Sequence, residues 1–275
     1  MKDNFPFDIE LAYSKVLKKL VTEIETKFKE IYLKGKSNSI IKLKKYKVDS
    51  GEVLKEYADD LINKQEIKIN ATDDKEREFL EYFEELLTTE YAFDLCINYI
   101  LETVEYSIDG VNKSVSKIIG VAFKEQPYYD EETIREILEE NIRLIKAEPT
   151  KYLRTYDKQI AKIVEEKIEE GLTLDDLVQA IQNTTGIEKN RAALIATDQV
   201  GNIFAETTKS QFKGIGLKKF IWITAGDARV RPTHAERDGK VYEWDNPPDG
   251  EIPGRPIRCR CTADVVESEV LMLAA

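Results

Sequence analysis

Apolar residues recur at steps of three and four over most of the first 213 residues, a spacing that predicts a mainly helical region. The most regular stripe predicts an amphipathic helix over residues 8–34. A second pattern extends from Asp73 to Gly110. Because this stretch exceeds the usual length of a globular helix, we expect it either to break once or to form a long spine of the fold.

Prolines and glycines set the expected ends of the next helices. A helix is predicted at 130–147, and Pro149 suits the first turn of the helix that follows it. Gly171 is expected to end that second helix as a C-cap. A further helix should end near Gly186, and the last long one should span residues 188–213.

The pattern changes abruptly at residue 214. Short alternating or β-rich runs at 218–224, 240–244 and 256–266 predict three strands, and turn-rich segments separate them. The window 214–261 also holds both tryptophans, the single histidine and two of the three cysteines. We therefore expect an α+β fold in which the mostly helical N-terminal two thirds precede a small α+β module with short strands and long loops.

These patterns predict three domains. The first is a helical region over 1–125, the second a helical linker bundle over 126–213, and the third the α+β module over 214–275. The chain has 275 residues, of which 42% are hydrophobic, enough for a packed core. Its formal net charge of −11 argues against a protein that coats nucleic acid over its whole surface.

One segment departs from this acidic balance. Residues 27–47 carry eight Lys and one Glu, a local charge of 8 − 1 = +7. The simplest interpretation is a solvated helix end and loop, and the alternative is contact with a nucleic-acid backbone or an acidic partner. The candidate contact residues on this segment are Lys34, Lys36, Lys42, Lys44, Lys45 and Lys47.

The sequence also indicates the compartment. Its apolar runs are much shorter than the roughly 18–20 residues that span a bilayer, and the N-terminus lacks the pattern of a signal peptide. Cys96, Cys259 and Cys261 are too few for a disulfide scaffold. We therefore expect a soluble, unsecreted protein in a reducing compartment, with no membrane partner.

A possible metal site lies in the last predicted strand. Residues two apart in a strand point to the same face, so Cys259 and Cys261 should present their thiols side by side. His234 adds a third donor of the kind that Zn²⁺ takes, and Asp227 or Asp238 could complete a tetrahedron. The alternative is two small apolar core residues beside a histidine that hydrogen-bonds to a loop carbonyl.

Other chemistry is less well supported. A cysteine nucleophile needs an exposed thiolate of low pKa, which a core-facing thiol does not provide. The charged residues near His234 permit two interpretations. Asp227 could accept hydrogen bonds from Arg229 and Arg231 and so fix the loop, or these arginines, with Arg258 and Arg260, could face phosphates or a partner's carboxylates.

The ordered combination of motifs resembles the phage Mu F-like head-morphogenesis family. It consists of WITAGDARVRPTHAERDG (222–239), Pro247-Pro248, Gly250, Gly254 and Cys259-Arg260-Cys261, preceded by the helix NRAALIATDQVGNIFAETTKSQF. The similarity covers roughly residues 150–265. Besides His234, Cys259 and Cys261, the motif and structural positions are Trp222, Thr224, Asp227, Arg229, Arg231, Gly239 and Arg260, of which Asp227 is also a possible metal ligand.

The resemblance implies a structural role and no enzymatic activity. Members of the family are minor capsid proteins that associate with the portal and affect head assembly or the fate of packaged DNA. We therefore expect a virion protein, present in the host cytoplasm during assembly, whose partners are the portal protein, the capsid interior and packaged double-stranded DNA. A structural Zn²⁺ is the one cofactor expected. The alternative is a metal- or cysteine-dependent hydrolase delivered with the virion.

Overall fold

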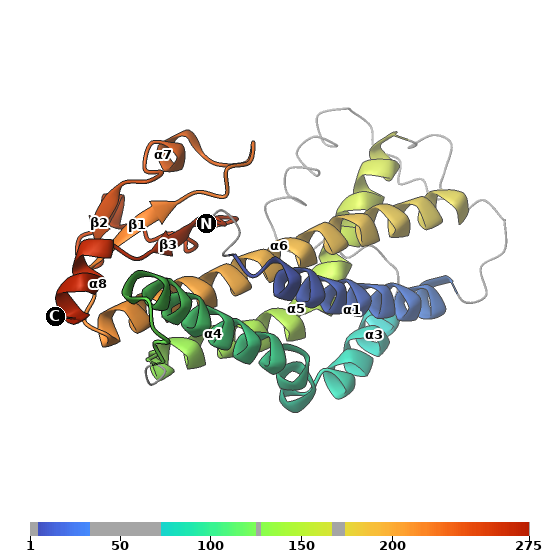
Figure 1. Ribbon diagram of the computed structural model, residues 1–275. Helices are drawn as coiled ribbons and strands as arrows, with labels where there is room; N and C mark the ends of the chain where they lie inside the picture. The colour runs from blue at the N-terminus through green and yellow to red at the C-terminus, as the bar shows by residue number, and fades with distance from the viewer. Residues whose placement is uncertain (1–4, 34–72, 125–127, 167–173, 275) are drawn as a thin grey trace. The chain divides into compact units, whose positions relative to one another are not determined.

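A computed structural model of the chain describes residues 5–33, 73–124, 128–166 and 174–274 (Figure 1). Helix α1 spans Phe7–Leu33, which confirms the helix predicted from the most regular apolar stripe. The second predicted pattern breaks once, into α3 (Asp73–Leu86) and α4 (Thr89–Ile119). The predicted end of this pattern at Gly110 was wrong, because α4 continues through Gly110 to Ile119.

The next two helices are longer than predicted. Helix α5 spans Glu131–Glu166 with Pro149 inside it, so the prediction of two helices separated at Pro149 was wrong. Helix α6 spans Leu174–Gly214 and passes through Gly186 without ending there. The expected C-cap at Gly171 lies outside the described residues.

The C-terminal part contains a three-stranded antiparallel sheet with the strand order β2-β1-β3. Strand β1 spans Lys219–Ile223, β2 spans Val241–Glu243 and β3 spans Thr262–Asp264. All three predicted strands exist, but the third is much shorter than the predicted 256–266. Mainly helical elements followed by this small sheet confirm the α+β prediction.

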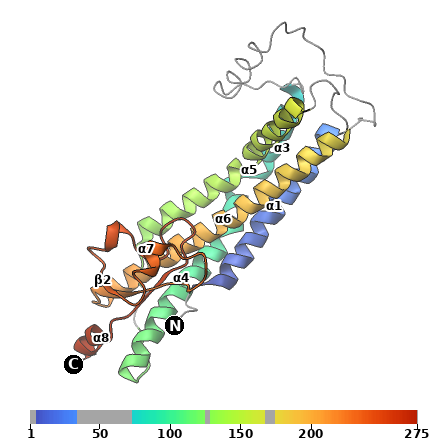
Figure 2. The same ribbon diagram turned by 90° about the horizontal axis from the view of Figure 1, so that it is seen from above.

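Short helices complete this part of the chain. Helix α7 spans Pro232–Ala235 between β1 and β2, the 3₁₀ helix η1 spans Pro248–Gly250, and α8 spans Glu267–Ala274. In both views α7, α8 and the strands gather around the C-terminal part of α6 (Figure 1, Figure 2).

The sheet shares its hydrophobic core with long helices. Phe220 and Trp222 alternate along β1 and are fully buried, as the period of two in a strand requires. Val111 and Val115 of α4 belong to the same cluster, and so does Phe212 of α6. The sheet is therefore covered by α6, which directly precedes β1, and by α4, which lies far from it in the sequence.

The chain forms two compact units. Unit 1 contains Met1–Leu17, Thr89–Ile145 and Arg191–Ala275, and therefore the whole sheet. Unit 2 contains Lys18–Thr88 and Lys146–Asn190. The three domains proposed from the sequence stay a prediction.

Aromatic rings fill the core of unit 2. The ring of Phe28 in α1 stacks on Tyr32 with 4.0 Å between centroids and meets the edge of Phe79 in α3 at 5.5 Å. It also contacts Tyr156 of α5 at 4.5 Å. Such pairs contribute beyond the area they bury, so this cluster ties three helices together.

In unit 1 a buried polar network links three helices. The Tyr13 hydroxyl of α1 donates to Asn141 Oδ1 of α5 at 2.7 Å, and Asn141 Nδ2 donates to Gln199 Oε1 of α6 at 2.8 Å. Asn141 is fully buried and also donates to the Ile137 carbonyl. Among the described residues, no helix is both long enough and apolar enough to cross a membrane.

Candidate metal centre

Strand β1 and helix α7 together position His234. After β1 the chain turns, and Asp238 Oδ1 accepts the backbone N–H of Thr224 at 2.8 Å. The backbone N–H of Gly239 donates to the Trp222 carbonyl at 2.8 Å, and Gly239 has a φ of 71° that favours glycine. These bonds hold the loop against β1, and α7 carries His234 into the interior, where it is 2% exposed.

A bend immediately before β3 places the two thiols. Cys259 and Cys261 precede β3, so the prediction that both lie within a regular strand was wrong. Arg258 has a φ of 59°, which is incompatible with an extended strand at that residue. Its backbone N–H donates to Asp198 Oδ1 of α6 at 2.6 Å. This anchor fixes the bend, and both cysteines are nevertheless buried.

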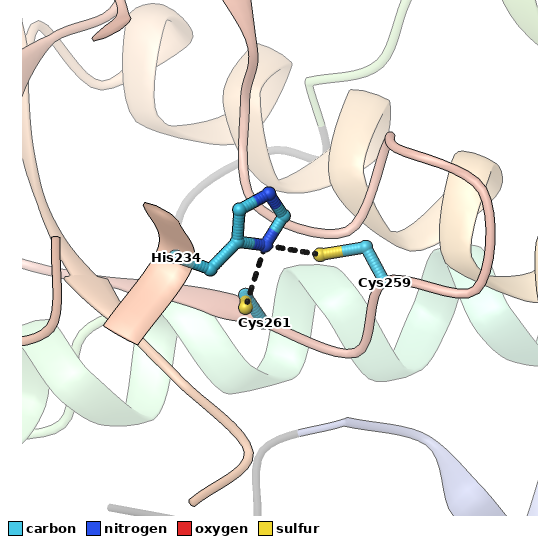
Figure 3. A group of neighbouring side chains, drawn as sticks. All are labelled: His234, Cys259 and Cys261. Atoms are coloured by element: carbon cyan, nitrogen blue, oxygen red, sulfur yellow. Dashed lines mark hydrogen bonds between the residues drawn. The ribbon is translucent and has the colours of Figure 1, made fainter. Parts of the chain in front are cut away.

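The histidine and the two cysteines meet as the sequence predicted (Figure 3). His234 Nδ1 lies 3.5 Å from Cys259 Sγ and 3.5 Å from Cys261 Sγ. The three candidate ligand atoms all lie within 4.8 Å of one another. The arrangement brings together three buried donors of the types that Zn²⁺ selects.

The other imidazole nitrogen faces a carboxylate. His234 Nε2 lies 3.4 Å from Glu251 Oε2. Arg237 is buried and donates through Nη1 to Glu251 Oε2 at 2.7 Å and through Nη2 to Asp249 Oδ2 at 2.5 Å. The Arg237 guanidinium also lies over the Trp222 ring, 4.9 Å from its centroid. Glu251 is thus held in place and can accept the Nε2 proton, which leaves the Nδ1 lone pair directed at the sulfurs.

The two thiols do not ionise alike. A hydrogen bond from the Cys261 thiol lowers the pKa of Cys259 to about 6, helped by the backbone N–H groups of Cys261 and Gly254. The interaction with Cys259 and burial raise the pKa of Cys261, although the Trp222 indole N–H and the Ala225 N–H act in the opposite direction. The pair therefore loses its first proton more readily than its second.

A polar rim lies on the solvent side of the thiols. Asp227 accepts hydrogen bonds from the Arg229 backbone N–H at 2.9 Å and from the Arg260 side chain. Burial raises the pKa of the Asp227 carboxyl, but the Arg229 backbone N–H and the Arg260 and Arg229 guanidinium groups together outweigh burial, so the pKa is lowered. Arg231 Nη2 donates to the Ile257 carbonyl at 2.5 Å. Asp227 thus pairs with arginines and lies outside the three-residue group.

These contacts also place the remaining motif residues. Trp222 lies edge-on to His234, with 5.2 Å between ring centroids. The Arg260 guanidinium lies over the ring of Phe7 in α1, 5.4 Å from its centroid. Of the two arginines expected to pair with Asp227, Arg229 does so, whereas Arg231 donates to the Ile257 carbonyl and Arg260 pairs with Asp227.

Some residues predicted to be functional lie outside the described part of the chain, and some residues of the site were not predicted from the sequence. The predicted DNA- or partner-binding lysines Lys34, Lys36, Lys42, Lys44, Lys45 and Lys47 lie outside the described residues. Glu251, Asp249 and Asp198 were not identified from the sequence, because each reaches the site through the tertiary fold and at no characteristic spacing. Arg237 was expected near His234, but its two carboxylate partners were not.

The comparison with protein families agrees with the motif. The family model described as "Phage Mu protein F like protein" matches residues 158–264. Over these residues the chain is similar to phage Mu F-like proteins. The phage Mu F-like region contains the last turns of α5, all of α6 and the complete His234, Cys259 and Cys261 group.

The curated relative that matches the chain carries no description of its function. A curated protein of Haemophilus influenzae, described as an uncharacterized protein, is 37% identical over 122 residues. The match covers 44% of this chain and 26% of the relative, so the chain spans about a quarter of that protein's length. No solved structure matches the chain.

Proposed function

We propose that this protein is a minor head protein of a tailed double-stranded DNA phage or prophage. It associates with the portal and capsid interior and acts in head morphogenesis, DNA packaging or DNA ejection. The observation that carries this proposal is the phage Mu F-like region over residues 158–264. On this proposal the protein is part of the virion and is found in the host cytoplasm during assembly.

The surroundings of the candidate metal centre leave little room for a substrate. His234, Cys259 and Cys261 are each at most 4% exposed. The recess beside them has a volume of about 20 Å³. Ligand pockets usually measure several hundred Å³, so a peptide, glycan or nucleotide does not fit beside the thiols. This argues against the alternative of a metal- or cysteine-dependent hydrolase acting at these residues.

Exposed apolar side chains on the helices of unit 1 supply a surface for a protein partner. Leu101 of α4 is 52% exposed and Leu11 of α1 is 53% exposed. Apolar side chains on a helix face are typical anchors for a partner groove or helix. We infer that the portal contacts the helical part of the protein.

Co-purification with the portal protein of the same phage or prophage tests the proposal. The full chain carrying an affinity tag should retain the portal protein when both are co-expressed, and purified virions should contain the chain. Leu101→Ser should weaken retention, whereas Glu105→Ser, an exposed substitution one turn further along α4, should not. Absence of the chain from virions together with no retained portal protein would overturn the proposal.

A contact with packaged DNA is the remaining part of the proposal, and it depends on the basic segment 27–47. Binding to duplex DNA should weaken steeply with salt, because counterions are released when lysines neutralise phosphates. Replacing Lys42, Lys44, Lys45 and Lys47 by Gln should reduce that slope. Absent binding, or binding that does not respond to salt, would remove DNA from the list of partners.

A further inference from the structure

We propose that His234 Nδ1, Cys259 Sγ and Cys261 Sγ bind one Zn²⁺ ion, that Glu251 positions the histidine for it, and that the fourth coordination position opens on an arginine-rimmed recess. The proposal concerns the site itself and holds whichever partner the protein binds.

The separations between the donors are those that a tetrahedral zinc ion imposes. With Zn–N and Zn–S bonds of about 2.1 and 2.3 Å, a nitrogen and a sulfur ligand lie about 3.6 Å apart. His234 Nδ1 lies 3.5 Å from each of the two sulfurs. The two sulfurs lie within 4.8 Å of each other, so all three atoms can reach one ion.

The residues around these donors match those that support metal ligands. A histidine ligand usually donates its second ring N–H to a carboxylate, and here Nε2 faces Glu251 at 3.4 Å. Arg237 Nη1 in turn donates to Glu251 Oε2 at 2.7 Å, so the carboxylate behind the histidine is itself held in place.

The fourth position follows from the shape of the site. In the part of the chain that the structure describes, the group of candidate ligands has three members. The recess of about 20 Å³ beside them is large enough for one water molecule. Its rim carries Arg229, Arg231 and Arg258 together with Asp227. A water or a small anion therefore completes the tetrahedron.

Metal content of the full chain is the first test. Protein purified under reducing conditions from zinc-supplemented medium should contain about one zinc per chain by elemental analysis. Co²⁺ exchanged into the site should give thiolate charge-transfer and tetrahedral ligand-field absorption, and azide should change that spectrum through the open position. No bound zinc together with no Co²⁺ absorption would overturn the proposal, and a spectrum insensitive to azide would overturn the open fourth position.

Cysteine variants locate the ion. Cys259→Ser and Cys261→Ser should each lower zinc content and remove part of the charge-transfer absorption. Cys96→Ser is the matched control, because Cys96 is also buried and reduced but lies in α4. Should the first two variants fail to fold, titration of thiols in the native protein distinguishes the cases, since zinc release should accompany modification of two cysteines. Unchanged zinc content in both folded variants would contradict the assignment.

The role of Glu251 has its own control. Glu251 and Asp249 both pair with Arg237, but only Glu251 also faces His234. Glu251→Ala should weaken zinc affinity by about 10–100-fold, the usual effect of losing the carboxylate behind a ligating histidine. Asp249→Ala should leave zinc affinity within about threefold of the original, because it disturbs only the arginine. Equal losses in both variants would assign the effect to Arg237 and overturn the positioning role.

Discussion

The carboxylate of Asp198 accepts the backbone N–H of Arg258 at 2.6 Å, and this bond stabilises a residue whose φ is positive. Asp198 lies on α6, whereas Arg258 begins the bend that carries both thiols. The helix therefore fixes the loop on which the candidate metal centre depends.

Removing this anchor should destabilise the loop. Asp198→Ala should lower the free energy of unfolding by about 1–2 kcal/mol, since it leaves the Arg258 N–H without its charged acceptor. Asp198→Asn keeps an acceptor oxygen and should lose less. Urea denaturation followed by tryptophan fluorescence measures both, and equal midpoints for Ala and the original protein would contradict this role.

Two glycines in helices should respond oppositely to alanine. A Cβ at Gly214 would lie 2.1 Å from Tyr128 Cγ, so Gly214→Ala must displace that ring and should destabilise the protein by about 1–3 kcal/mol. Gly110 lies inside α4 with nothing within 4 Å of an added Cβ. Gly110→Ala should therefore stabilise the protein by about 0.5–1 kcal/mol. Thermal unfolding of the two variants checks the difference in sign.

The buried network around Asn141 should be sensitive to truncation. Asn141→Ala leaves the Tyr13 hydroxyl and the Gln199 carbonyl oxygen without their partner and opens a small cavity. We expect a loss of about 2–4 kcal/mol in the free energy of unfolding. In the background Tyr13→Phe, which removes one of the stranded groups, the same substitution should cost less. Additive losses in this double-mutant cycle would show that the two side chains do not interact.

Asp157 gives unit 2 a pH dependence. Burial, with a smaller effect of Glu76, raises the pKa of Asp157 from 3.8 to about 6. Between these two values the native state binds the proton and the unfolded state does not, so this carboxyl destabilises the protein as the pH rises through that window.

Asp157→Asn tests this sign. The variant should be more stable than the original protein at pH 7 by about 1–2 kcal/mol, a figure reduced from the full shift because the carboxyl is partly exposed. The advantage should disappear below about pH 3, where the carboxyl of the original protein is neutral in both states. Denaturant titrations at several pH values measure it, and parallel stability curves for the two proteins would rule out this contribution.

The sequence predicted the helices that have a regular apolar stripe and failed where packing overrides a local signal. The stripe of α1 repeats without interruption, so its bounds could be predicted almost to the residue. Pro149 and Gly186 are strong local breakers, yet both lie inside helices. Tyr152, one turn after Pro149, is almost fully buried. Burial of this kind can offset the roughly 3 kcal/mol that an interior proline costs.

The candidate site also has parts that the sequence predicted and parts that depend on the tertiary fold. His234, Cys259 and Cys261 could be grouped by donor type alone, and the structure brings them together. The reason given for the pairing of the thiols was wrong, because a bend at Arg258 and not a strand places them. Glu251 could not be predicted, since its approach to His234 depends on the path of the loop around Arg237.

The shared core of the sheet also has a consequence for biosynthesis. Val111 and Val115 leave the ribosome long before Phe220 and Trp222, the β1 residues that join the same cluster. Until then the nascent chain presents an apolar helix face with no sheet to cover it. Co-translational folding of unit 1 must therefore wait for the last quarter of the polypeptide, and a nascent chain stalled before β1 is the species that we expect chaperones to bind.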